Sequence, residues 1–65
     1  MNDTPRLAPD HVLVIDDDAD LLRLLSMRLR AWGIRVSTAI SAEEGLSRVA
    51  IETPQLVISD IRLPG

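Results

Sequence analysis

The sequence predicts an α/β protein built on a parallel sheet. Short apolar runs rich in β-branched residues alternate with two longer segments of helical period, in the order strand, helix, strand, helix, strand. Each connection between successive runs is long enough for a helical crossover, which parallel strands require. Acidic side chains directly follow the first and the third run. We therefore expect the functional site of the chain at the ends of those two strands.

The first strand and the first helix occupy the chain up to residue 33. The run from His11 to Ile15 is too short for a helix and is predicted to be a buried strand, with His11 at the surface or at an edge. Asp18 or Asp20 can cap the helix that follows, and Gly33 can end it in a left-handed conformation. The apolar stripe of this helix, expected in the core, consists of Leu21, Leu25, Leu29 and Trp32, widened by Leu22.

The second half supplies a strand, a helix and a strand. Residues 34–39, "IRVSTA", alternate in polarity as a strand does. Ser41 and Glu44 have the spacing of a capping box, and the proline after Thr53 ends the helix. Residues 56–59, "LVIS", predict a third buried strand that ends at Asp60. The apolar face of the second helix is Ala42, Leu46, Val49 and Ala50, and Gly45 weakens this helix.

Composition narrows the classes of protein. The 65 residues contain no cysteine, 7 basic residues and 10 acidic ones. The mildly acidic balance argues against direct nucleic-acid binding, and the absence of cysteine suits a reducing cytoplasm. No apolar run approaches the roughly 18 residues that span a membrane. Residues 1–10 are expected to be a disordered lead-in, and a chain below about 70–80 residues has only a small core.

Three carboxylates form the candidate site. Asp16 and Asp17 follow the first strand, and Asp60 follows the third. If the strand order is 2-1-3, these acids meet at the point where open α/β sheets bind ligands. Two like charges at about 4 Å repel by roughly 4 kcal/mol at an effective dielectric near 20, so a shared cation is favoured. Oxygen ligands without histidine or cysteine select a hard ion such as Mg²⁺, beside which a carboxylate can attack phosphorus.

Plainer interpretations of the acidic run remain open at this point. Residues 16–20 can be a solvated cluster that caps the first helix and favours its dipole. For Asp18 and Asp20 this surface interpretation is preferred. A calcium-binding loop is excluded, because such a loop needs glycine at its sixth position and glutamate at its twelfth, where Leu21 and Met27 stand.

The motifs "VLVIDDDADLL" and "LVISDIRLPG" resemble the response-regulator receiver domain of bacterial two-component signalling. The resemblance covers residues 11–65 and implies the N-terminal part of a flavodoxin-like, doubly wound parallel sheet. It implies that Asp60 is the phosphoacceptor and that Mg²⁺ is bound by Asp16, Asp17, Asp60 and the backbone carbonyl of Arg62. No further catalytic residue and no organic cofactor are implied.

The resemblance also implies a role and partners. A receiver takes a phosphoryl group from a sensor histidine kinase, here partly through the first helix, and acts as a signalling switch rather than a turnover enzyme. Its output is expected to be transcriptional and its location cytoplasmic. Receivers also use a Ser/Thr after a fourth strand and a Lys after a fifth, which this chain lacks, so we expect it to be unable to switch alone. We also expect the open edge of the third strand to pair with another chain.

A second enzyme class shares part of the pattern. Phosphohydrolases of the haloacid-dehalogenase type carry an Asp-x-Asp-x-Thr/Val motif after their first strand. Asp16 and Asp18 fit it, with Asp16 as the nucleophile, but Asp20 stands where Thr or Val is expected. Labelling of Asp60 or of Asp16 by a phosphodonor would separate the two classes.

Overall fold

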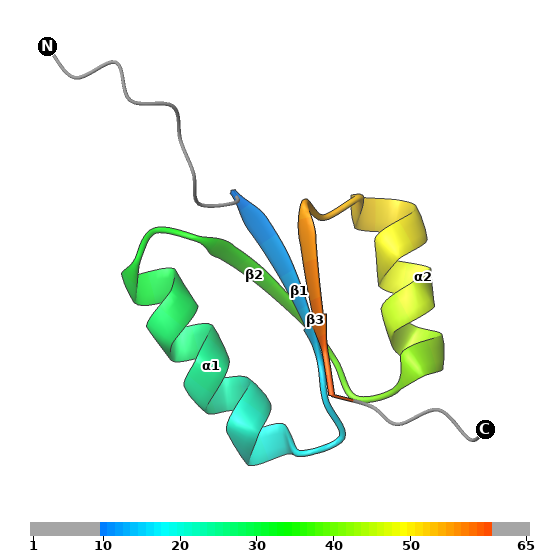
Figure 1. Ribbon diagram of the computed structural model, residues 1–65, viewed down its shortest axis with the longest axis horizontal. Coiled ribbons are helices and arrows are strands. Elements are labelled where there is room, and N and C mark those ends of the chain that lie inside the picture. The colour runs from blue at the N-terminus through cyan, green and yellow to red at the C-terminus, as the bar shows by residue number, and fades with distance from the viewer. Residues whose placement is uncertain (1–9, 61–65) are drawn as a thin grey trace, which may run out of the picture.

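The computed structural model describes residues 10–60, which form a sheet with one helix on each face (Figure 1). The predicted element order is confirmed, and what the sequence predicts for residues 1–9 and 61–65 lies outside the described residues. The elements are β1 His11–Ile15, α1 Ala19–Ala31, β2 Arg35–Ala39, α2 Ala42–Glu52 and β3 Leu56–Ser59.

The sheet has the order β2-β1-β3, and both strand pairs are parallel. In the register, Ile15 at the end of β1 lies opposite Ala39 of β2 and Ser59 of β3. The predicted 2-1-3 order is therefore confirmed, and the order of the strands reverses beside β1. The C-terminal ends of all three strands reach the same edge of the sheet.

Two small apolar clusters hold the helices to the sheet. Because side chains alternate along a strand, β1 contributes to both faces. On one face Val12 and Val14 pack with Leu22 of α1, and on the other Leu13 and Ile15 pack with partly buried Val49 of α2. The three most completely buried side chains, Val12, Leu13 and Val14, belong to β1, so the central strand organises both layers.

Helix α1 begins and ends as the sequence predicts, but its buried stripe is rotated. The carboxylate of Asp18 caps the helix, and Gly33 has φ 82° just beyond it. The buried residues of α1 are Leu22 and Ser26. The prediction of Trp32 in the core is wrong, since its side chain is 77% exposed. The helix ends at Ala31, so the chain turns away before Trp32 can reach the sheet, and Ile34 is buried instead.

Helix α2 lies close to the sheet at Gly45. The hydroxyl of Ser41 accepts a hydrogen bond from the backbone N–H of Glu44 at 3.1 Å, as the capping pattern predicts. Gly45 is the buried residue of this helix, and a Cβ there would collide with Ile15. Leu46, expected on the buried face, is exposed. The glycine that weakens α2 locally is thus what lets the helix approach β1.

Strand β3 differs from the prediction of a buried strand. Within residues 10–60 it pairs only with β1, and Leu56, Val57 and Ile58 are all exposed. Beside it lies an apolar hollow of about 250 Å³ against α2, lined in part by Leu46 and Val57. Leu56 and Ile58 lie opposite Val12 and Val14 and so are on the α1 side of the sheet, whereas Val57 lines the hollow on the α2 side.

Of the predicted lead-in, Asp10 alone is described. Its carbonyl oxygen accepts a hydrogen bond from the backbone N–H of Arg35 at 2.9 Å, and its own N–H donates to the side chain of Gln55. These two bonds tie Asp10 to the strands β2 and β3 at their N-terminal ends. No helix among residues 10–60 has the length and apolar character needed to cross a membrane.

Candidate functional site

The predicted acidic residues lie where β1 and β3 end. Ile15 and Ser59 are paired across these strands, so Asp16 and Asp60 are the next residues along each strand. The backbone N–H of Asp60 donates to the carbonyl oxygen of Ile15 at 3.1 Å, which extends the ladder by one step. Neighbouring parallel strands are about 4.8 Å apart, so this register makes Asp16 and Asp60 immediate neighbours.

Asp16 is held firmly. Its side chain is buried, and its backbone N–H donates to the carbonyl oxygen of Ala39 at 3.0 Å. Its Oδ1 accepts a hydrogen bond from the backbone N–H of Asp18 at 2.8 Å. One carboxylate oxygen therefore fixes the turn into α1, and the other has no hydrogen bond within residues 10–60. A buried carboxylate with spare acceptor capacity is suited to a cation.

The next two acids differ in their surroundings. Asp17 is exposed. The Oδ1 of Asp18 accepts hydrogen bonds from the backbone N–H groups of Asp20 and Leu21, at 3.0 and 3.2 Å. Asp18 is thus the residue that begins the helix, as the surface interpretation predicts, and its carboxylate is occupied. The sequence pattern alone left the choice between Asp18 and Asp20 open.

The described side chains do not converge into a closed metal site. Among residues 10–60, no three His, Cys, Asp or Glu side chains are grouped so as to hold a metal ion. Asp60 is exposed at the end of β3, and Arg62 lies outside the described residues. The donor set nonetheless fits a hard cation, because Asp16, Asp17 and Asp60 offer only oxygen. The metal ligands stay a prediction.

A second polar cluster, which the sequence analysis missed, lies at the start of β1. The prediction that His11 lies at the surface or at an edge is wrong, because His11 is buried in the central strand. Its Nε2 lies 2.8 Å from the Oγ of Ser37 and 3.3 Å from an oxygen of Glu52. Ser37 donates its hydroxyl proton to Glu52, whose other oxygen accepts from Arg48 at 2.8 Å. The only sequence signal was the i,i+4 spacing of Arg48 and Glu52.

This cluster shifts the pKa of two of its members, and the hydrogen bond to Glu52 raises the pKa of Arg48. The Ser37 hydroxyl, and next the Arg48 guanidinium, hold the pKa of Glu52 below its ordinary value of 4.5. Through Ser37 of β2 and Glu52 of α2, the cluster connects these two elements to His11, the first residue of β1. It lies at the opposite end of β1 from Asp16, so we assign it to stability and not to the chemistry of the acidic site.

Comparison with protein families gives a match over most of the chain. The family described as the response regulator receiver domain matches residues 12–65. This range includes every predicted site residue. No solved structure matches the fold with significance.

Several similar proteins are named as transcriptional regulators. Over 55 residues, 85% of this chain, it is 49% identical to the transcriptional regulatory protein GlrR of Escherichia coli. It is 43% identical over 53 residues to the transcriptional regulatory protein PrrA of Mycobacterium leprae, and 41% identical over 58 residues to the C4-dicarboxylate transport transcriptional regulatory protein DctD of Rhizobium meliloti.

The matched segment spans 12% of GlrR, 23% of PrrA and 13% of DctD. The similarity is thus confined to one part of much longer proteins. The family match covers β1 from Val12 onward, the other two strands, the two helices and both acidic motifs, and the sheet has the 2-1-3 order that the site hypothesis assumed. The chain therefore belongs to the response regulator receiver domain family.

Proposed function

We propose that this chain accepts a phosphoryl group on Asp60 and so works as the input side of a signalling switch. The observation that carries the proposal is the register of β1 and β3, with the hydrogen bond from Asp60 N–H to the carbonyl oxygen of Ile15. It puts an exposed carboxylate next to the buried carboxylate of Asp16. An acceptor must be accessible to its donor, and Asp60 is accessible.

The donor in this proposal is a phosphohistidine of a sensor kinase. A carboxylate oxygen of Asp60 attacks phosphorus and forms a new O–P bond, while the P–N bond to the imidazole breaks. The imidazole nitrogen keeps the electron pair and takes a proton from water. The product on this chain is an acyl phosphate, and no other residue of the chain is required as a nucleophile.

Mg²⁺ is the cation that we propose for the site. Asp16, Asp17 and Asp60 would bind it together with the backbone carbonyl of Arg62. When bound, it neutralises the carboxylates and the phosphoryl oxygens, which is the main requirement of phosphoryl transfer. In this arrangement the protein positions Asp60 by the strand register and holds Asp16 through its bond to Asp18.

The partners follow from the family and its named relatives. We propose that the kinase contacts α1, which carries Arg23, Arg28 and Arg30. The relatives GlrR, PrrA and DctD are transcriptional regulators, so we propose a transcriptional output and a cytoplasmic location. The haloacid-dehalogenase alternative has no comparable support, because the family match is to receivers.

The decisive experiment measures phosphorylation by mass. The chain is incubated with Mg²⁺ and a phosphorylated kinase or a small acyl-phosphate donor, and the modified residue is located by peptide mapping. We expect one phosphoryl adduct on Asp60, lost in Asp60→Ala and in the presence of a chelator. Asp18→Asn is the matched control, because asparagine caps helices as well as aspartate does. An adduct on Asp16, or one that survives Asp60→Ala, would overturn the proposal.

A further inference from the structure

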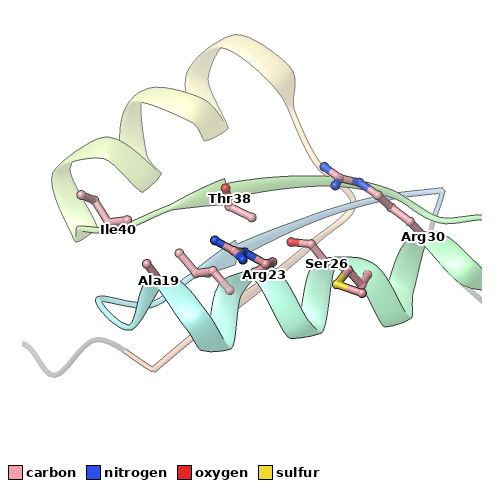
Figure 2. A pocket seen from close by; sticks show the side chains of 8 residues that line it. Ala19, Arg23, Ser26, Arg30, Thr38 and Ile40 are labelled. Atoms are coloured by element: carbon pink, nitrogen blue, oxygen red, sulfur yellow. The ribbon is translucent and has the colours of Figure 1, made fainter.

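A groove with both polar and apolar lining lies between α1 and the outer strand β2, and it runs from Ala19 and Ile40, beside Asp16, toward Arg30 near the end of α1. It has a volume of about 330 Å³, which is within the usual range for small-molecule sites. Its polar side chains are Arg23, Ser26 and Arg30 of α1 and Thr38 of β2, and none of its lining residues is acidic. Figure 2 shows the three helix side chains directed from α1 toward β2.

Ser26 is the unusual member of the groove. It is 4% exposed, and its hydroxyl has no hydrogen-bond partner among the described residues. A buried hydroxyl without a partner is costly to a protein, typically by about 1–3 kcal/mol. The sequence offers no structural reason for a serine at this position, because the stripe of α1 is otherwise leucine. An unpaired donor that faces a basic groove indicates a missing acceptor.

The two arginines are placed to supply charge. Arg30 donates to the backbone carbonyl of Val36 at 3.3 Å, which holds its guanidinium at the edge of β2. A guanidinium has five N–H donors, so most of those of Arg30 remain available. Arg23 makes no ion pair or hydrogen bond with any of residues 10–60. Its position is seven residues, or about 10 Å along the helix, before Arg30.

We propose that this groove binds a small phosphorylated molecule. The groove combines two guanidiniums with the hydroxyls of Ser26 and Thr38. A carboxylate has two oxygens and is satisfied by one guanidinium fork, whereas a phosphoryl group has three terminal oxygens and can use donors from several side chains. Arg23, Ser26 and Thr38 bind the phosphoryl group, and Arg30 binds a second anionic group of the same molecule. Binding in this groove does not require phosphorylation at Asp60.

Pyrophosphate is the probe, and binding is followed by amide chemical shifts of the labelled chain in the presence of a chelator. Without a divalent ion the acidic site repels phosphate, so only the groove is expected to respond. We expect shifts at Ser26 and Thr38 and none at Asp60. Shifts confined to the acidic edge, or equal binding of succinate, would overturn the assignment to a phosphoryl group in this groove.

Two variants distinguish specific binding of pyrophosphate in the groove from nonspecific electrostatic attraction of the anion to the basic helix α1. Arg23→Gln should weaken pyrophosphate binding about tenfold, which is the ordinary worth of one charged hydrogen-bonding group. Arg28→Gln removes the same charge from the same helix, outside the groove, and should change the affinity by no more than about twofold. Equal losses in the two variants would contradict the proposal. Both positions are exposed, so neither variant should affect folding.

Ser26→Ala should change stability and pyrophosphate affinity in opposite directions. Removal of an unpaired buried hydroxyl should raise the unfolding temperature of the free chain. The same change should weaken pyrophosphate binding severalfold, because the phosphoryl group loses a donor. If Ser26→Ala stabilises the chain and binds pyrophosphate as tightly as the wild type, the hydroxyl has no ligand and the proposal fails.

Discussion

The backbone N–H of Asp60 lies 3.1 Å from the carbonyl oxygen of Ile15, and this one bond joins the two acidic motifs of the chain. It continues the β1–β3 ladder beyond the paired residues Ile15 and Ser59. The position of Asp60 beside Asp16 is therefore set by backbone pairing. A change at exposed Asp60 should affect ligand binding more than the fold, whereas a change at Asp16 also removes the acceptor that holds the turn into α1.

The first prediction concerns Mg²⁺ and stability. If the ion binds only the folded chain, the free energy of unfolding should rise by about 2.7 kcal/mol at a free concentration of about 100 times Kd. Asp60→Asn should abolish this rise. It should not lower stability without Mg²⁺, because it removes one of the mutually repelling carboxylates. Urea unfolding with and without Mg²⁺ measures both effects.

Asp18→Asn is the control for this experiment, since the side chain of Asp18 is occupied by the backbone of α1. It should keep the Mg²⁺ effect. If Ca²⁺, Mg²⁺ and a monovalent salt at equal ionic strength stabilised the chain equally, the carboxylates would be a screened acidic surface and not an ion site.

The second prediction concerns the close approach of α2 to β1. A Cβ at Gly45 would meet the Cδ1 of Ile15 and would lie 2.9 Å from its Cγ1. Overpacking of this kind costs about 1–3 kcal/mol, against a gain of about 1 kcal/mol in helix propensity. Gly45→Ala should therefore lower the free energy of unfolding by about 1 kcal/mol. Chemical unfolding measures this change.

A double-mutant cycle isolates the cause. Ile15→Val removes Cδ1, the nearest atom, and keeps the carbon that corresponds to Cγ1, so in that background Gly45→Ala should be clearly less destabilising, because the larger part of the overlap is gone while the gain in helix propensity stays. Equal costs in the two backgrounds would show that the contact with Ile15 does not determine the effect of the glycine.

The third prediction is a pH dependence that comes from Glu52. Hydrogen bonds from Ser37 and next from Arg48 lower the pKa of folded Glu52 below its ordinary 4.5. A carboxylate whose folded pKa is lowered stabilises the fold above the unfolded value, and this stabilisation is lost as pH falls through the folded value. The free energy of unfolding should thus decrease below about pH 4.5, and Glu52→Gln should remove part of the slope.

The control is Glu43→Gln, which removes the same charge from the exposed first turn of α2. Ser37 and Arg48 direct their hydrogen bonds to Glu52 and not to Glu43, so this variant should leave the slope in place. Ser37→Ala should reproduce part of the effect of Glu52→Gln. Parallel curves for the wild type and Glu52→Gln from pH 3 to pH 6 would contradict the assignment.

Local signals in the sequence predicted the features that depend on few neighbours. Asp18 and Ser41 cap their helices because a cap needs only the next turn, and Gly33 has a positive φ because the chain must leave the helix there. The neighbouring positions of Asp16 and Asp60 followed from the rule that parallel strands end at one edge, once the strand order was assumed.

Features that depend on distant neighbours could not be predicted. The burial of His11 is decided by Ser37 and Glu52, which come from two other elements. Trp32 is exposed because α1 ends one residue before it, an offset that periodicity does not resolve. The buried Ser26 interrupts a leucine stripe, so a pattern of apolar residues placed the packed face of α1 one position away.

The last prediction concerns the open edge of β3. Its residues Leu56, Val57 and Ile58 are exposed, and the open edge of an apolar strand is a template for pairing with another chain. We predict that the 65-residue chain self-associates through this edge as its concentration rises.

Ile58→Lys should shift the equilibrium toward the monomer, because a lysine on an edge strand opposes strand pairing. Ile51→Lys, at an exposed position of α2, is the matched control and should associate as the wild type does. Sedimentation velocity over a range of concentrations measures the equilibrium, and a wild-type chain that stays monomeric, with an unfolding transition independent of concentration, would show that the β3 edge does not pair.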